Sequence, residues 1–317
     1  MADKKTIIMM LAAVMAVACG QKKAESFKAL PFPDISIPGM MSDVQERADY
    51  AAEHFWDGLT DPERTYPCDS LLVSGVKKAD VEQKFANWTS VLEMASPAIH
   101  AKAVSRLFDR AIACETGDTS SNVFETVIGL AEKYLYDPNS PLRNEEFYLH
   151  FVSRMAGYEG YSDEIRAKYA YQAEMCSLNR PGAKAADFRF ADRRGKIRTL
   201  HEIGSPMTLL FFSNPGCGAC MDIINMLKNE PKISEMILTG RLAVVNIYID
   251  EDIEAWRDYM SVYPEEWYNG FDPDMKIRTD NLYNVRAIPS LYLLDDEKRV
   301  IMKDAPEDKV MSRLLSL

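Results

Sequence analysis

The residues of this sequence best suited to chemistry are two cysteines three positions apart, Cys217 and Cys220, in the tetrapeptide Cys-Gly-Ala-Cys. The apolar run Met207–Phe212 and the short segment Ser213–Gly216 precede them, and the helical pattern Met221–Lys228 follows. This order predicts a strand, a turn and a helix N-terminus that carries both thiols. Unpaired N–H groups and the helix dipole stabilise a thiolate there, and such cysteines have pKa values of roughly 3.5 to 7.5, against about 8.5 when free. We therefore expect Cys217 to be the nucleophile and Cys220 to resolve a mixed disulfide by forming the Cys217–Cys220 bond.

Two other uses of this cysteine pair remain open. A zinc site would need two further soft or imidazole ligands. The other cysteines are isolated, and no ligand spacing is visible among the four histidines, which are His54, His100, His150 and His201. We therefore expect no metal. The second alternative is an inert structural disulfide, because isolated pairs with this spacing also serve as staples.

A proline motif supports the redox interpretation. The sequence Ala287-Ile288-Pro289-Ser290 opens a further apolar run, Leu291–Leu294. Together with the dithiol, this motif resembles the thioredoxin superfamily, and most closely the membrane-tethered extracytoplasmic thiol-disulfide oxidoreductases typified by TlpA and ResA. The resemblance covers roughly Asn179–Leu317. Further residues that carry it are Pro181-Gly182, Ala186-Asp187-Phe188, Asp192, Gly195 and Leu200.

The resemblance implies an α/β fold, a thioredoxin-like three-layer domain with a central mixed sheet. It also implies that the Ile288–Pro289 bond is cis and faces the dithiol. Because Pro289 has no N–H, the backbone of Ile288 would be free to pair with an extended substrate segment. An ordinary trans proline at the first residue of a strand is the alternative.

The chain departs from the family where an acid could assist Cys220. Many thioredoxins carry a buried acid at the position that Phe211 occupies here, and some TlpA-like proteins carry a glutamate where this chain has Ile223. Asp222 and Glu202 lie nearby in sequence but match neither pattern. The general base is therefore unassigned.

The segment before Pro289 is longer than a simple crossover requires. Glu251–Tyr263 is predicted to be a helix, and Tyr263–Phe271 an acidic, aromatic loop. TlpA-like proteins carry an insertion in this region. Trp267 could bind substrate at the rim of the site or pack against the extra helix, and both interpretations stay open.

The N-terminus predicts export. Lys4-Lys5 precedes the apolar stretch Thr6–Ala18, which is too short to span a bilayer but suits the core of a signal peptide. The sequence Ala16-Val17-Ala18-Cys19-Gly20 resembles a bacterial lipobox, which implies a signal peptide over residues 1–18 and acylation of Cys19. Conventional cleavage near Ala18 is the alternative. We expect a lipid-anchored protein of the cell envelope, facing the periplasm rather than the cell surface, with no other membrane segment.

The remaining sequence predicts a tether and a helical domain before the thioredoxin-like domain of residues 179–317. Residues 19–41 form the tether and an extended segment, since Pro31, Pro33 and Pro38 exclude a regular helix there. Residues 42–178 form an all-α domain that resembles a helical domain of unknown function found in certain bacterial lipoproteins. Ser42 is predicted to cap its first helix, with Gln45 completing a capping box. Further helices are expected over Lys77–Met94, Ala98–Ala113, Ser121–Leu135, Leu142–Met155 and Ser162–Cys176.

Three more cysteines fall in the helical domain. Cys114 and Cys176 lie in helical patterns and are expected to be small buried hydrophobes. Cys68 lies in a loop and is the candidate for pairing, but an odd number of cysteines leaves at least one thiol free.

These features predict an exported, lipid-anchored thiol-disulfide oxidoreductase that needs no cofactor besides the Cys217–Cys220 disulfide. Its partners would be disulfides of exported proteins and a membrane thiol electron donor that restores the dithiol. The formal net charge of −11 argues against nucleic-acid binding. A binding or assembly lipoprotein that uses the thioredoxin fold as a scaffold is the alternative. A peroxidase fits less well, because no threonine stands in the peroxidatic setting before Cys217.

Overall fold

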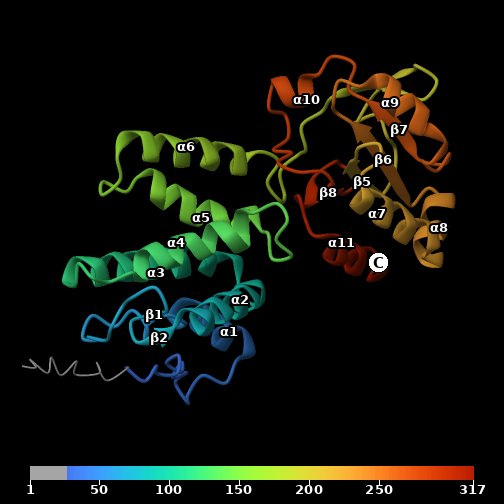
Figure 1. Ribbon diagram of the computed structural model, residues 1–317. Coiled ribbons are helices and arrows are strands. Elements are labelled where there is room, and N and C mark those ends of the chain that lie inside the picture. Colours follow the sequence, from blue (N-terminus) through green and yellow to red (C-terminus); the bar gives the residue numbers. More distant parts are fainter. Residues whose placement is uncertain (1–26) are drawn as a thin grey trace, which may run out of the picture.

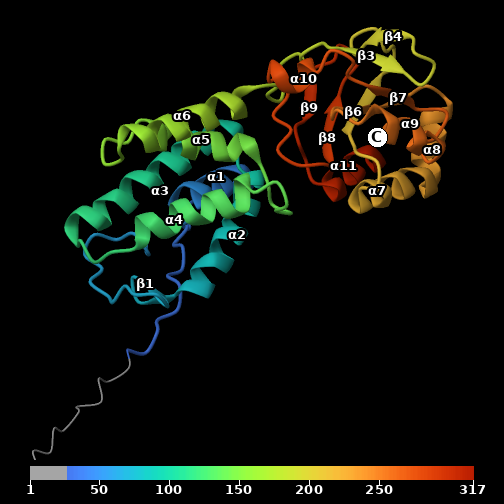
Figure 2. The same ribbon diagram turned by 45° about the horizontal axis from the view of Figure 1, so that its top comes forward.

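The computed structural model describes residues 27–317. The predicted signal peptide and the lipidation candidate Cys19 lie outside these residues. Figures 1 and 2 show two domains side by side, one helical and one built on a sheet. Within the described residues, no helix is long and apolar enough to cross a membrane.

Six helices make up most of the helical domain. They are α1 (Val44–His54), α2 (Lys78–Met94), α3 (Pro97–Gly117), α4 (Val123–Ala131), α5 (Glu145–Ala156) and α6 (Asp163–Ser177). A π-helical turn, Glu132–Tyr136, continues α4. Their apolar faces share one core, in which Trp56, Phe85 and Trp88 lie edge to face or tilted against one another. Trp88 also donates from its indole N–H to the carbonyl of Ala52, so the aromatic residues are structural.

Two details of the helical domain differ from the sequence-based expectation. Asp43 caps α1 by accepting from the backbone N–H of Glu46, so the predicted cap at Ser42 is wrong by one residue. A small hairpin of β1 (Leu72–Val73) and β2 (Val76–Lys77) was not predicted, because two-residue strands are too short to show an alternating pattern. The proline-rich segment is extended as expected, and its Phe32 packs into the helical core.

Seven strands form the sheet of the second domain. They are β3 (Arg189–Asp192), β4 (Ile197–Thr199), β5 (Met207–Phe212), β6 (Leu242–Tyr248), β7 (Tyr268–Phe271), β8 (Ser290–Leu294) and β9 (Val300–Met302). The order is β4-β3-β7-β6-β5-β8-β9, in which β5, β6 and β7 are parallel and the other neighbours antiparallel. This mixed sheet confirms the predicted fold class.

Alternate residues of β5 fill the two faces of the sheet, as the period of two along a strand requires. Leu209 and Phe211 pack into the core beneath α7 (Gly218–Asn229), α8 (Pro231–Leu238), α9 (Ile253–Asp258) and α11 (Glu307–Leu315). Leu210 and Phe212 pack into the opposite core, which the short helix α10 (Lys276–Thr279) helps to cover. Two layers of helical or irregular chain therefore enclose the sheet.

The segment before β8 corrects two expectations. The helix predicted over 251–263 is α9 followed by a short 3-10 turn, Tyr259–Ser261. The region predicted as a loop contains β7, which pairs with β3 and β6. Asn269-Gly270 indicated a turn, but Gly270 is needed for packing, because a Cβ there would lie 2.5 Å from the ring of Phe190.

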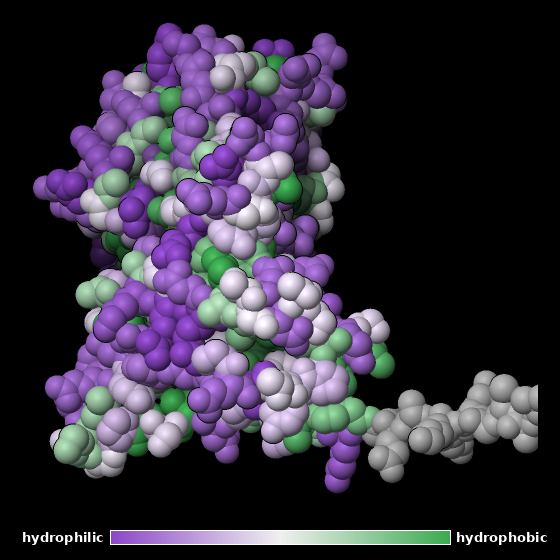
Figure 3. Space-filling model, turned by 90° about the vertical axis from the view of Figure 1, so that its left-hand side faces the viewer, coloured by the Kyte–Doolittle hydropathy of each residue, from purple (hydrophilic) through white to green (hydrophobic). Residues whose placement is uncertain are grey.

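The edge of the sheet formed by β8 and β9, together with α11, faces the helical domain (Figures 1 and 2). The outer end of the helical domain is mostly hydrophilic, with apolar residues in small separate groups (Figure 3). Residues that join the domains include Arg180 with Glu146, and Lys309 with Glu93.

Candidate active site

The two cysteines lie at the junction of a strand, a turn and a helix. β5 ends at Phe212, the chain turns through Ser213–Gly216, and α7 begins at Gly218 with Cys217 as its N-cap. Gly216 has a φ of 71°, a left-handed conformation that costs glycine little and other residues more. This glycine lets the chain reverse so that both thiols sit at the helix N-terminus.

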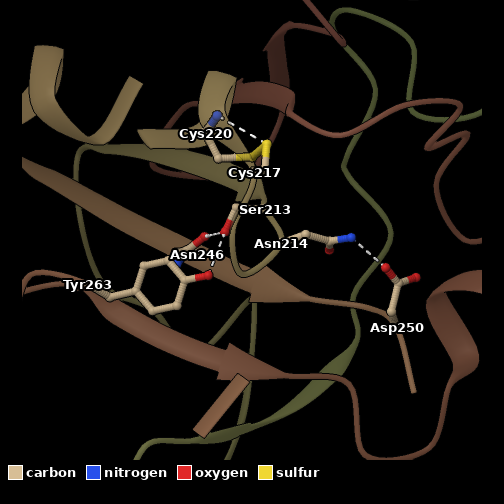
Figure 4. Close-up of a disulfide and its surroundings, with 7 residues drawn as sticks. All are labelled: Ser213, Asn214, Cys217, Cys220, Asn246, Asp250 and Tyr263. Atoms are coloured by element: carbon tan, nitrogen blue, oxygen red, sulfur yellow. Dashed lines mark hydrogen bonds between the residues drawn. A yellow bond between two sulfur atoms is a disulfide. The ribbon is translucent and has the colours of Figure 1, made fainter. Parts of the chain in front are cut away.

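Cys217 and Cys220 form a disulfide, with 5.2 Å between their Cα atoms. The backbone N–H of Cys220 donates to Sγ of Cys217 over 3.1 Å (Figure 4). Cys217 is partly exposed, whereas Cys220 is only 2% exposed. A partner can therefore reach Cys217 first, and the thiolate of Cys217 would keep a backbone donor when the disulfide opens.

The Ile288–Pro289 loop lies beside the dithiol. β8 pairs antiparallel with β5 so that Ser290 is opposite Phe212, which places the residues before Ser290 next to those that follow Phe212. The Ile288–Pro289 bond is cis. Both residues are partly exposed, and Ile288 packs against the same apolar cluster as Cys217. Neither backbone polar group of Ile288 has a hydrogen-bond partner within residues 27–317.

A buried network of uncharged polar side chains lies under the turn. Ser213 donates from Oγ to Oδ1 of Asn246 over 2.5 Å and lies 3.5 Å from the hydroxyl of Tyr263 (Figure 4). Asn246 donates from Nδ2 to Oδ1 of Asn269 over 3.0 Å. Ser213, Asn246 and Asn269 are each 1% exposed, and burial raises the pKa of Tyr263, so its hydroxyl stays protonated. The sequence signal for this network was Asn246, a polar residue inside the apolar strand β6.

No carboxylate occupies the two positions where the family can carry an acid. Phe211 and Ile223 are buried in the apolar core on the dithiol side of the sheet. Asp222 is exposed, and exposed Glu202 accepts from the backbone N–H of Thr199. The carboxylate that contacts the turn is Asp250, which accepts from Nδ2 of Asn214 over 2.6 Å, with that amide pointing away from Ser213 (Figure 4).

The carboxylate of Asp250 also forms an ion pair with Arg278. Through Asn214, Asp250 therefore stabilises the side of the turn and does not lie beneath the disulfide.

Trp267 is 4% exposed and belongs to the same apolar core as Phe211 and Cys220. Of the two open interpretations, burial favours packing.

The remaining cysteines and histidines do not converge on the dithiol. Cys68, Cys114 and Cys176 are free thiols. Burial raises the pKa of Cys114 and raises that of fully buried Cys176 to about 12. In the described part of the chain, no group of three or more His, Cys, Asp or Glu side chains could hold a metal ion.

Comparisons with known proteins match both parts of the chain. Residues 12–179 match a family model described as a domain of unknown function (DUF5106), and residues 205–300 match a model described as thioredoxin-like. A crystal structure of a thioredoxin-like protein from Bacteroides caccae is 32% identical, covers 91% of this chain and 99% of its own, and superposes with a TM-score of 0.77. No curated protein matches.

Two further structures match less than half of this chain. The C-terminal domain of an uncharacterized protein from Bacteroides fragilis is 42% identical over 43% of this chain and 98% of its own, with a TM-score of 0.42. The thioredoxin domain of a thiol-disulfide oxidoreductase from Bacteroides vulgatus is 17% identical over 43% and 96%, with a TM-score of 0.38.

Proposed function

Because this chain belongs to the thioredoxin-like family, we propose that it is a protein thiol-disulfide oxidoreductase that reduces disulfides of exported proteins. One observation carries the proposal. A partly exposed Cys217 is paired with a buried Cys220 at a helix N-terminus, beside a loop in which the backbone of Ile288 has no hydrogen-bond partner among residues 27–317. Reactive dithiols combine these features, whereas buried structural cysteines are inert.

The reaction follows from the exposure of the two sulfurs. The Cys217 thiolate attacks one sulfur of a substrate disulfide, forms a mixed disulfide and expels the other sulfur as a thiolate, which takes up a proton. Cys220 then loses its proton and attacks Sγ of Cys217, which forms the Cys217–Cys220 bond and releases the second substrate thiol. The substrate gains two electrons and two protons, and the enzyme dithiol becomes the disulfide.

The substrate segment would be extended at the point of attack. The N–H and C=O groups of Ile288 can each pair with the backbone of such a segment, which would lie extended along the loop that precedes β8. Pro289 cannot donate a hydrogen bond, so this pairing is confined to Ile288. A polypeptide thereby presents its disulfide to Cys217 in a defined register.

The same proposal includes where the protein is held in the cell and what returns electrons to it. Acylation of Cys19 would hold the protein on a membrane surface of the cell envelope, facing the periplasm. A membrane thiol donor would return two electrons to the Cys217–Cys220 disulfide after each cycle, because an oxidising compartment keeps exposed thiols oxidised. The sequence Ala16-Val17-Ala18-Cys19 supports this setting.

Thiol trapping of the full-length protein across defined redox buffers, read by mass, tests the proposed function. We expect one reversible two-electron transition that is lost in Cys217→Ser and in Cys220→Ser and kept in the matched control Cys68→Ser. A potential near about −270 mV indicates a reductase, whereas one near about −120 mV indicates an oxidant. Cys217→Ser should be inactive towards a protein disulfide, and Cys220→Ser should accumulate the mixed disulfide.

A pair that stays oxidised in every buffer would refute the enzyme and favour the scaffold alternative, a lipoprotein that binds or assembles partners.

A further inference from the structure

Four charged side chains are buried together where the two domains meet. We call Glu145, Arg286, Lys303 and Asp304 the interdomain ion cluster. Glu145 begins α5 of the helical domain, and the other three belong to the thioredoxin-like domain. Their side chains are 2%, 12%, 2% and 6% exposed, respectively. Charged residues are rarely this buried unless they are paired, so the cluster requires both domains.

Glu145 is the only member from the helical domain, and its carboxylate lies against three donor groups across the interface. Oε1 accepts hydrogen bonds from Nδ2 of Asn284 at 2.9 Å and from Nε of Arg286 at 3.0 Å, and Oε2 forms an ion pair with Nζ of Lys303 at 2.7 Å. Removing one partner of a buried ion pair leaves an uncompensated charge, which is strongly unfavourable. The position of α5 and the positions of these three donors are therefore tied together.

The chain just before α5 adds two further contacts. Arg143 donates from Nε to the carbonyl of Asp304 and from Nη2 to the carbonyl of Ala305, both over 2.9 Å. The guanidinium of Arg286 lies 4.2 Å from the centre of the Tyr136 ring, within the range of a cation–π interaction. The helical domain thus fixes both the backbone after β9 and the side chain of Arg286.

The cluster reaches the loop that borders the dithiol. Arg286 precedes Ile288 and Pro289, and Ser290 follows them. Asp304 accepts from Nη2 of Arg286 over 3.3 Å and from Oγ of Ser290 over 2.7 Å. The loop is therefore held on both sides of Ile288, and one of these anchors depends directly on Glu145.

We propose that Glu145 of the helical domain is a positioning residue for polypeptide substrates, because through Arg286, Asp304 and Ser290 it holds the Ile288 backbone in register for docking. This inference rests on the proposed function and assigns a role to the helical domain. It separates two classes of substrate. A polypeptide disulfide needs the backbone of Ile288, whereas a small organic disulfide needs access only to Cys217.

Steady-state kinetics of the full-length protein with two substrates tests the proposal. The polypeptide substrate is insulin and the small substrate is 2-hydroxyethyl disulfide. In Glu145→Gln the amide oxygen can replace only one carboxylate oxygen, so the NH₂ group faces either Lys303 or the two donors Asn284 and Arg286. The variant also removes the negative charge that pairs with Arg286, which weakens the anchor of the loop. We expect KM for insulin to rise about tenfold, the value of one to two backbone hydrogen bonds. The rate with 2-hydroxyethyl disulfide should stay within twofold of the wild-type rate, and the redox potential should be unchanged.

Ser290→Ala is the second variant, since it removes one hydroxyl from the loop without leaving a buried charge unpaired. It should show the same selective rise in KM, and it decides the question if Glu145→Gln fails to fold. Glu93→Gln is the matched control, because it breaks the exposed Lys309–Glu93 ion pair between the domains without touching the loop. This control should have the wild-type KM for insulin and the wild-type rate with 2-hydroxyethyl disulfide.

The positioning role is overturned if both variants that fold keep the wild-type KM for insulin, or if the two substrates are affected equally. A wild-type protein that reduces neither substrate would instead overturn the proposed function, and the positioning role with it.

Discussion

Replacing Asn246 by leucine tests whether the buried polar network holds the dithiol turn. Leucine has a similar shape but makes no hydrogen bonds. The variant loses the bond that Asn246 accepts from Ser213 at 2.5 Å and the bond that it donates to Asn269 at 3.0 Å. Oγ of Ser213 then retains only the weak 3.5 Å contact with Tyr263. Oδ1 of Asn269 loses its donor, although Nδ2 still donates to the carbonyl of Pro264.

The magnitude follows from these two orphaned atoms. Each buried polar group left unpaired costs about 1–3 kcal/mol, and burying the leucine side chain returns about 1.5–3 kcal/mol. Taking the middle of each range, we expect the free energy of unfolding of the oxidised protein to fall by about 2 kcal/mol. Urea denaturation followed by tryptophan fluorescence measures this change. Asn229→Leu, an exposed position in the same domain, is the matched control and should change the free energy by less than about 0.5 kcal/mol.

A double-mutant cycle with Ser213→Ala isolates the hydrogen bond. In the wild type, Ser213→Ala leaves the Asn246 carbonyl oxygen without its donor, whereas in Asn246→Leu it removes a hydroxyl that is already unpaired. The two changes should therefore couple by about 1 kcal/mol or more. Additive effects, or an Asn246→Leu variant as stable as the control, would refute the view that this network supports the turn.

Two further predictions concern buried titrating groups. Burial, with the Glu145 carboxylate nearby, raises the pKa of Asp304 from 3.8 to about 6. The pKa of Asp304 is higher in the folded protein than in the unfolded chain. Protonation of Asp304 therefore stabilises the fold fully below about pH 3.8, and this stabilisation is lost as the pH rises through 6. The difference in unfolding free energy between the wild type and Asp304→Asn should therefore fall by about 2 kcal/mol from pH 4 to pH 7, and a flat difference would contradict this. The second prediction concerns thiol labelling at pH 8, followed by mass spectrometry. The partly exposed Cys68 should be modified quickly, and the fully buried Cys176 only after the protein is unfolded in urea. Labelling of Cys176 in the native protein would contradict this, because it would show that the site opens to solvent.

The parts of the fold that could be predicted from the sequence are those with strong local signals. β5 was predicted at its observed bounds, because a six-residue apolar run is followed by turn residues. α2 was predicted within one residue, because its periodicity extends over several turns. The position of the cysteines at the start of α7 follows from the same two signals.

Other features depend on tertiary contacts that have no local signal. β7 is a strand because it pairs with β3 and β6, and it needs Gly270 there because a Cβ would clash with Phe190, although its Asn-Gly sequence is typical of a turn. The interdomain ion cluster joins residues that are far apart in sequence, and isolated charged residues usually lie on the surface. Glu145 in particular looks like a favourable acidic residue in the first turn of α5, which hides its contacts with the other domain.

The uncharged network beneath the dithiol bears on how Cys220 loses its proton. Ser213 and Asn246 can orient the turn but cannot accept a proton at neutral pH, and the hydroxyl of Tyr263 stays protonated. The first step of the proposed reaction, however, produces a thiolate on the substrate itself. This thiolate can accept the proton of Cys220 if it stays close to it. We infer that a substrate held in register at Ile288 keeps its departing thiolate near Cys220, and that positioning by the loop replaces the missing acid.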